Sequence, residues 1–399
     1  MNTPLNIFTL WKSREWYVVL AITAVIFGFN VYRVATHQNT TSLDFVNYAQ
    51  FVTPMKLHGT ITKPHFIYPG LVALASLLFP GLSYTALGAG FVFLSDLFCA
   101  TVLWMFWKKV VPISASTFIP LILTIFSMIL APVSIVTLFR HNLYIGYIAI
   151  TTYHNPPLLL SRPLLLIHFL IFANALASLQ VSKRLTIWSA LLMILTTLTK
   201  PNYATIMLPA SMLSALWTIW KKEMPTFRFI VLGTVLPAIA VLAWQYYFTF
   251  FTHYEADTTA SVIFAPFLVY AARSHYLFPR FLLSILFPLG VLIVYGKEAM
   301  RDRFYMTGFM LFLFGAFESY FLAESGVRLY DGNFFFSGQI GLFLWFLVSM
   351  KFVLQDLYSK PKETRWNKSF VVLSSLFALH LISGVVWYAC ESIATGTFW

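Results

Sequence analysis

Long apolar runs constrain this chain more than any other feature of its sequence. A helix that crosses the hydrocarbon core of a bilayer needs roughly 20 mainly apolar residues. Eleven segments meet or approach that length: 16–35, 84–107, 114–139, 157–180, 185–199, 203–220, 228–250, 277–295, 304–323, 335–352 and 370–389. We therefore predict an all-α polytopic membrane protein with about 11 transmembrane helices.

The composition supports this class and excludes a water-soluble domain. Hydrophobic residues make up 59% of the 399 residues and charged residues only 10%, whereas about a quarter of a typical soluble domain is charged. The net charge of +12 would suggest nucleic acid in a soluble protein. In a membrane protein it is first assigned to the two sides of the bilayer, so we expect no nucleic-acid partner.

One apolar run, residues 66–79, is too short to span. It carries Pro69-Gly70 and is followed by Pro80-Gly81, and runs of about 10 to 14 residues favour interfacial or re-entrant helices. If this run lies along the membrane surface, most lysines and arginines fall in loops on one side of the membrane. The positive-inside rule identifies that side as cytoplasmic. This topology puts the N-terminus inside and the C-terminus outside.

These segments organise the chain as a single transmembrane domain, 1–399. Residues 36–83 form a first external loop with interfacial helices, and 84–399 hold helices 2 to 11. The compact chain with short tails favours a multi-pass protein of a bacterial cell membrane, with the endoplasmic reticulum as the eukaryotic equivalent.

The external segments hold most of the side chains that carry chemistry, whereas the cytoplasmic loops are basic and otherwise plain. A protein with its polar side chains on one face is built to act at that face. The external candidates for substrate binding are Asn47, His65, His154, Asn155, Glu324, Asp331 and Asn333.

The first external loop predicts an amphipathic helix in the interface. Apolar residues recur there at spacings of three and four, from Phe45 to Met55, and we expect this stripe to face lipid. Asp44 and Asn47 share a different edge of the helix. Asp44 is either a helix cap, since a carboxylate is favourable at a helix N-terminus, or a functional group, and the two roles are compatible.

The order of motifs resembles the C-type (GT-C) glycosyltransferase superfamily. An aspartate, Asp44, heads an interfacial helix after the first span; "Lys-Pro-x-x-x-Tyr-x-x-x-x-x-Leu" follows from Lys63; and a half-helix ends at Phe79-Pro80-Gly81. A long span then ends in Lys108-Lys109. The segment 193-MILTTLTKPNYATIMLPA-210 is similar to the "Leu-Thr-Lys-small" turn of that superfamily, so the resemblance covers roughly the first 210 residues.

The resemblance implies an inverting transfer of a sugar from a polyprenyl-phosphate donor to a lipid, glycan or protein acceptor on the outer face. Asp44 is then the catalytic base. Many relatives carry a second acidic residue near the first one or in the next external loop, whereas Asp44 is the only carboxylate in the first loop and 140–156 has none. We therefore predict no cofactor and no divalent metal.

Four basic residues are candidates for binding the donor phosphate: Lys63, Arg162, Lys200 and Arg328. Lys200 sits between two spans, where it either contacts a lipid phosphate or snorkels to the interface. Arg162 lies seven residues after Asn155. It either binds the phosphate through its guanidinium group or anchors the end of its helix at the membrane surface. Arg328 lies four residues after Glu324, so the two either bind substrate or pair with each other.

Two other functions remain open. A polysaccharide polymerase or ligase also acts on lipid-linked sugars from outside, but it gives no reason for the half-helix after the first loop. A transporter is expected to carry charged or broken-helix sites near the membrane midplane. Only Asp96 lies that deep, and we favour a structural role for it.

Overall fold

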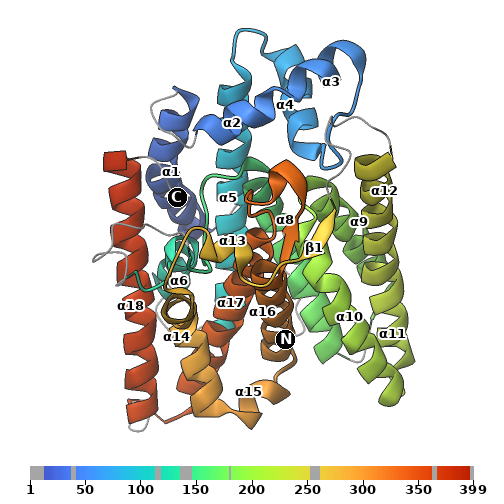
Figure 1. Ribbon diagram of the computed structural model, residues 1–399. Coiled ribbons are helices and arrows are strands. Elements are labelled where there is room, and N and C mark those ends of the chain that lie inside the picture. The colour runs from blue at the N-terminus through green and yellow to red at the C-terminus, as the bar shows by residue number, and fades with distance from the viewer. Residues whose placement is uncertain are drawn as a thin grey trace.

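The computed structural model describes residues 13–36, 42–112, 118–134, 146–178, 181–251, 261–361 and 366–395. Nearly all of its regular structure is helical (Figure 1). In chain order the elements are α1 (Arg14–Ala35), α2 (Ser42–Ala49), α3 (Val52–His58), α4 (Ile67–Leu78), α5 (Tyr84–Val110), α6 (Phe118–Ile129), α8 (Pro156–Ala177), α9 (Lys183–Thr199), α10 (Asn202–Trp220), α11 (Met224–Ile230), η2 (Val231–Val235), α12 (Leu236–Phe251), β1 (Val262–Phe264), α13 (Leu268–Ala271), α14 (Leu277–Tyr295), α15 (Lys297–Arg301), α16 (Arg303–Phe321), β2 (Leu322–Glu324), η3 (Gly326–Arg328), α17 (Phe335–Ser359), α18 (Lys368–Cys390) and η5 (Glu391–Thr395).

The all-α membrane class predicted from the sequence is confirmed. Among the described residues, nine helices are long and apolar enough to cross a membrane. Two of the predicted spans are not among them: 185–199 corresponds to the 17-residue α9, and the described part of 114–139 contains the 12-residue α6. The predicted half-helix at 66–79 is the 12-residue α4.

The prediction for 114–139 was wrong in its length, and Pro132 gives the reason. The residue before a proline is disfavoured in the helical region, and Leu130–Ser134 has no regular secondary structure. Backbone groups there are bonded to other segments instead: Thr151 Oγ1 donates to the Leu130 carbonyl, and the Ala131 carbonyl lies 2.8 Å from Nδ1 of His380. Residues 114–117 and 135–139 of the predicted span lie outside the described part of the chain.

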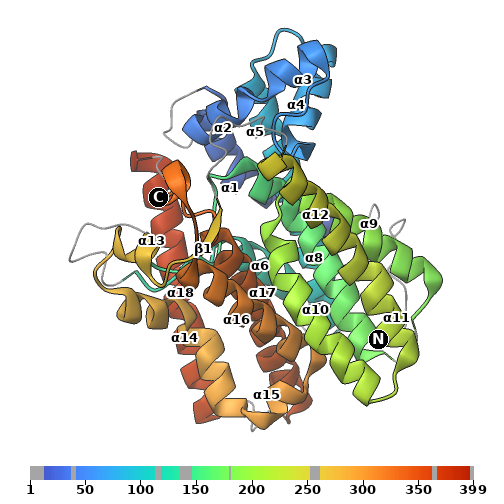
Figure 2. The ribbon, with the colours of Figure 1, turned by 45° about the vertical axis from the view of Figure 1, so that its right-hand side comes forward.

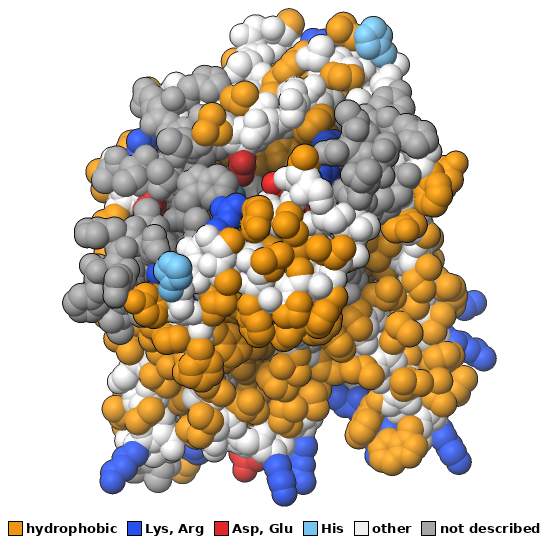
Figure 3. Space-filling view, in the orientation of Figure 1, with side chains coloured by type: hydrophobic (Ala, Val, Ile, Leu, Met, Phe, Trp, Pro, Cys, Tyr) orange, Lys and Arg blue, Asp and Glu red, His pale blue; other side chains and the backbone are white. Residues whose placement is uncertain are grey.

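The helices form a bundle whose two ends differ (Figures 1 and 2). Helices α2, α3 and α4 lie across the upper end, and α15 lies at the lower end. Ion pairs join the lower-end segments, which were all predicted to be cytoplasmic: Lys108 with Glu15 (2.7 Å), Arg303 with Glu223 (3.6 Å) and Lys351 with Asp302 (2.9 Å). Figure 3 shows a broad hydrophobic surface between the ends and lysines and arginines at the lower end.

The first-loop helices pack onto the bundle through their own apolar cluster. Phe45 of α2 is 3% exposed, and Val52 of α3 is fully buried; both join residues of α1, α4, α5 and α8. The stripe beginning at Phe45 therefore faces protein rather than lipid, which corrects the sequence prediction. Because Phe45 is anchored, the neighbouring Asp44 is held at a defined place at the upper end.

Close packing between α16 and α17 depends on glycine. A Cβ at Gly341 would lie 2.5 Å from the Leu311 carbonyl oxygen, which is backbone and cannot swing away. We expect Gly341→Ala to lower the free energy of unfolding by about 1–3 kcal/mol, as overpacking typically does. The control is Gly90→Ala in α5, where nothing lies within 4 Å of the added carbon. Denaturant unfolding in micelles checks this, and equal effects of the two substitutions would contradict it.

Candidate active site

Most of the polar residues singled out in the sequence meet at the upper end of the bundle. They come from four places: the start of α2, the segment that leads into α4, the loop before α8, and the turn between α9 and α10. The loop between β2 and α17 adds a fifth. Figure 3 shows acidic and basic side chains around a hollow in this part of the surface.

The turn at Lys200 owes its shape to Pro201. A proline disfavours a helical conformation in the residue before it, and Lys200 is extended, with φ −156° and ψ 119°. Helix α9 therefore ends at Thr199, and α10 begins at Asn202. The result is a sharp turn that leaves the Lys200 side chain inside the protein.

Lys200 is a buried cation, 5% exposed. Its Nζ lies 4.5 Å from the centre of the Phe336 ring, and the ammonium makes no hydrogen bond to any described residue. Burial lowers the pKa of Lys200 to about 8, while the charges of Glu324 and Asp44 oppose this shift. The amine therefore stays mostly protonated at pH 7, in a place where a charge is costly unless an anion is present.

Asp44 lies in the first turn of α2 and interacts electrostatically with Lys200. The helix begins at Ser42, so Asp44 is inside the first turn rather than at the capping position. Burial raises the pKa of Asp44 to about 6, and the positive charge of Lys200 acts in the opposite direction. A carboxylate with this pKa is ionised at pH 7 and is a better proton acceptor than an ordinary aspartate.

Lys63 and His65 lie beside this pair. Burial and the charge of Arg328 lower the pKa of Lys63 to about 8, although Glu324 and Asp331 oppose the shift. Burial, followed by the charge of Lys200, lowers the pKa of His65 to about 3. His65 is therefore neutral at physiological pH and adds no positive charge to the cluster.

The loop after β2 closes the cluster from the other side. Strand β2 pairs with β1, with Glu324 opposite Val262. Asn333 Nδ2 donates to Glu324 Oε2 (2.8 Å), so two of the residues predicted to bind substrate are in contact. Burial raises the pKa of Glu324. Asp331 is exposed at the rim.

The loop before α8 contributes His154 and Asn155. Asn155 is the N-cap of α8, because its Oδ1 accepts from the Leu158 amide (3.1 Å), and its side chain lies within hydrogen-bonding reach of the Tyr48 hydroxyl. The His154 ring lies 6.0 Å from that of Phe336, the aromatic residue below Lys200. Burial, together with the Lys200 charge, lowers the pKa of His154 to about 4.

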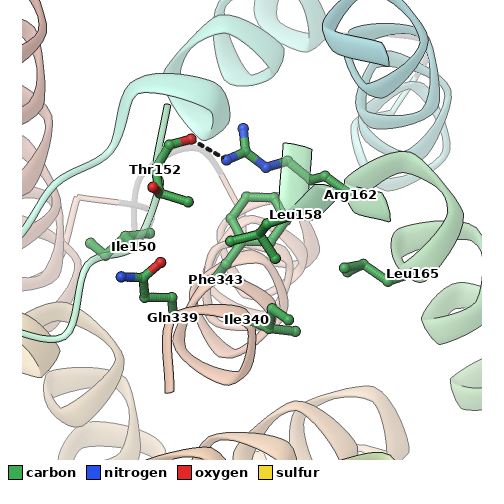
Figure 4. Close-up of a pocket in the computed structure, with 8 residues that line it drawn as sticks. All are labelled: Ile150, Thr152, Leu158, Arg162, Leu165, Gln339, Ile340 and Phe343. Atoms are coloured by element: carbon green, nitrogen blue, oxygen red, sulfur yellow. Dashed lines mark hydrogen bonds between the residues drawn. The ribbon is translucent and has the colours of Figure 1, made fainter. Parts of the chain in front are cut away.

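Two predicted residues lie apart from this cluster. Asn47 is exposed on α2 and makes no hydrogen bond to any described residue. Arg162 is buried, and its Nη2 donates to the Thr152 carbonyl (2.6 Å). With Gln339 and Phe343 it lines a mostly apolar pocket (Figure 4). Its charge interacts with Asp96 of α5.

Sequence reasoning missed three residues that shape the cluster: Phe336, Asn202 and Gln245. Asn202 Nδ2 donates to the Asn333 carbonyl and to Ser337 Oγ, both at 2.9 Å. Gln245 is a lone glutamine in an apolar span, and polar residues within spans are expected to have a partner, so that signal was present. Phe336 follows two other phenylalanines, and nothing in its pattern distinguishes it.

Searches against protein-family models, curated proteins and solved structures find no match for this chain. Its function is therefore argued from the site. Among the described residues, no three histidine, cysteine, aspartate or glutamate side chains are grouped as metal ligands, and independence from metal stays a prediction.

Proposed function

We propose that this protein is a membrane glycosyltransferase of the GT-C type. It would move a sugar from a polyprenyl-phosphate-linked donor to an acceptor hydroxyl on the extracytoplasmic face, with inversion at the sugar C1. The observation that carries the proposal is the electrostatic interaction between a buried ammonium, Lys200, and a carboxylate of raised pKa, Asp44. No described residue accepts a hydrogen bond from the Lys200 ammonium.

The buried ammonium favours an anionic ligand. A buried charge is stable in a protein when it is paired and hydrogen-bonded. Among the described residues, Lys200 has the aromatic face of Phe336 and the charges of Glu324 and Asp44, but no hydrogen-bond acceptor. A phosphate group supplies the missing acceptors. Lys63 and Arg328, which interact electrostatically with each other, add positive charge next to it.

Asp44 supplies the base. In the proposed step, the Asp44 carboxylate takes the proton of the acceptor hydroxyl as that oxygen forms a bond to the sugar C1. The bond from C1 to the phosphate oxygen breaks, and its electron pair leaves on the polyprenyl phosphate, whose charge Lys200 and Lys63 stabilise. A single displacement of this kind inverts the configuration at C1.

The path of the chain suits a donor with a lipid tail. The segment with Lys63 and His65 runs directly into α4, whose outer face exposes Leu74, Leu77 and Leu78. A short apolar helix of this kind lies at the membrane surface. The donor phosphate would therefore lie at the polar cluster, and its prenyl chain would lie in the lipid next to α4.

The ionisation of the site predicts a bell-shaped dependence of rate on pH. The rate is expected to rise through about pH 6, where Asp44 becomes ionised, and to fall through about pH 8, where Lys200 and Lys63 lose their protons. Values of kcat/KM for the donor between pH 5 and pH 9, which report the ionisation of the free protein, measure this profile. A rate that does not change between pH 5 and pH 7 would exclude Asp44 as the base.

The function itself is tested with purified protein and a panel of radiolabelled polyprenyl-phosphate sugars, using membrane extract as the source of acceptor. Transfer of label from one donor, with release of polyprenyl phosphate, supports the proposal. Growth of a polymer from lipid-linked oligosaccharides would favour a polymerase or ligase instead. Movement of an intact donor across vesicles, without cleavage, would favour a transporter.

A further inference from the structure

A single buried side chain joins two of the segments that form the candidate site. Gln245 of α12 is 6% exposed. Its Nε2 donates to two backbone carbonyls, that of Thr197 in α9 (2.9 Å) and that of Pro64 in the first loop (3.1 Å). Thr197 lies three residues before Lys200, and Pro64 lies between Lys63 and His65.

The need for a donor at Thr197 follows from the sequence. In a regular helix, the Thr197 carbonyl would accept from the amide of residue 201, but residue 201 is a proline and has no N–H. The helix also ends at Thr199. Pro201, which shapes the turn at Lys200, thus leaves the Thr197 carbonyl without its usual donor. Gln245 of α12 donates to that carbonyl instead.

The end of α9 does not explain the second hydrogen bond of Gln245, which its Nε2 donates to the Pro64 carbonyl. The Pro64 carbonyl belongs to a segment with no regular secondary structure, which crosses over the bundle before α4 begins at Ile67. Because one amide group contacts both carbonyls, the two segments are held at a fixed separation. The charge of Lys200 acts on His65, which shows that the joined segments bring their side chains together.

From this geometry we propose that Gln245 is a positioning residue that holds the Lys63-Pro64-His65 segment against the Lys200 turn. The catalytic part of this inference rests on the proposed glycosyl transfer, in which the two segments bind one donor phosphate between them. Gln245 itself touches neither reacting group. Its Oε1 is buried and accepts no hydrogen bond from the described residues, so the amide is placed for its two donated bonds.

The test compares Gln245→Met, which keeps the volume of the side chain and removes both donors, with Tyr305→Phe. Tyr305 is fully buried at another place in the bundle and donates to the Pro288 carbonyl (3.2 Å), so its substitution also removes a buried hydrogen bond to the backbone. Gln245→Asn, whose shorter side chain reaches only one carbonyl, serves as a milder variant if Gln245→Met does not fold.

The first readout is independent of activity. Folded protein is treated with a water-soluble acetylating reagent, and labelling of Lys200 is quantified by mass spectrometry relative to the exposed Lys297. We expect about tenfold faster labelling of Lys200 in Gln245→Met and no change in Tyr305→Phe. Unchanged labelling of Lys200, or an equal increase in both variants, overturns the proposal.

The second readout connects Gln245 to catalysis. With a donor that the wild type uses, KM of Gln245→Met is expected to rise about tenfold per folded molecule, with an intermediate rise for Gln245→Asn and none for Tyr305→Phe. A purely structural role would lower the folded fraction and leave KM unchanged. If the wild type uses no donor but Lys200 labelling still rises, Gln245 positions the segments and the proposed function is the part that fails.

Discussion

Asp44→Asn is expected to lower the rate of sugar transfer by about 10²- to 10⁴-fold, the range that a well-placed general base contributes. Asparagine has nearly the same shape as aspartate but cannot accept the proton of the acceptor hydroxyl. Because the change removes the base and keeps the cations, the dissociation constant of the donor should stay within about threefold of the wild-type value. Initial rates and donor titrations on the same preparations measure both effects.

A matched control is available at the opposite end of the bundle. Asp356→Asn makes the same chemical change in a carboxylate that pairs with Lys360 (2.6 Å) and accepts from the Tyr295 hydroxyl (2.8 Å). This variant should keep the wild-type rate within about twofold. If Asp44→Asn behaves in the same way, Asp44 contributes to the start of α2 and not to the chemistry.

Lys200→Met is expected to weaken binding of the donor by about 100-fold or more. Removing one partner of a buried, hydrogen-bonded charge pair typically costs about 2–5 kcal/mol, and about 1.4 kcal/mol corresponds to a factor of ten. At the same time the free protein should become more stable. The lowered pKa of Lys200 means that the folded state holds this proton less tightly than the unfolded chain does.

The sign of this stability effect follows from linkage. Below about pH 8, Lys200 is charged in both states, and the buried charge destabilises the folded protein. Between about pH 8 and the ordinary pKa of 10.5, the unfolded chain binds more protons than the folded one, so the penalty fades as pH rises. The stability gained by Lys200→Met should therefore be largest near neutral pH and should shrink above pH 8.

Lys351→Met is the control for this prediction. Lys351 is equally buried, at 4% exposure, but its Nζ is paired with Asp302 at 2.9 Å. Removing this cation leaves a carboxylate without its partner, so the variant should be less stable than the wild type while donor binding is unchanged. Thermal unfolding in the same detergent distinguishes the two signs. A loss of stability in both variants would contradict the view that the buried charge of Lys200 destabilises the free protein.

Much of the fold could be predicted because hydropathy dominates it. The positions of the long spans and of the short helix α4 follow from the lengths of apolar runs. Two details could not be read from the pattern. Pro132 marks the end of α6 in the sequence, but the group that bonds to the Ala131 carbonyl belongs to His380, far away in the sequence. The stripe from Phe45 has the same period whether it faces lipid or protein.

The candidate site was predicted in part for a similar reason. Side chains such as Asp44, Lys200 and Glu324 stand out because only 10% of the residues are charged, and the fold brings them together. Arg162 met the same criterion, yet it points into a different pocket. The sequence places Arg162 near the start of an apolar span, whereas the direction of its side chain around the helix axis depends on packing that the sequence pattern does not encode.

The most direct test of the account needs only the donor, because the acceptor does not enter it. The dissociation constant of the donor is measured by one titration on wild type, Asp44→Asn and Lys200→Met. We expect Asp44→Asn to bind like the wild type and Lys200→Met to bind at least about 100-fold more weakly, as separate roles in proton transfer and phosphate binding require. Equal binding by all three proteins would contradict a phosphate site at Lys200 and, with it, the proposed function.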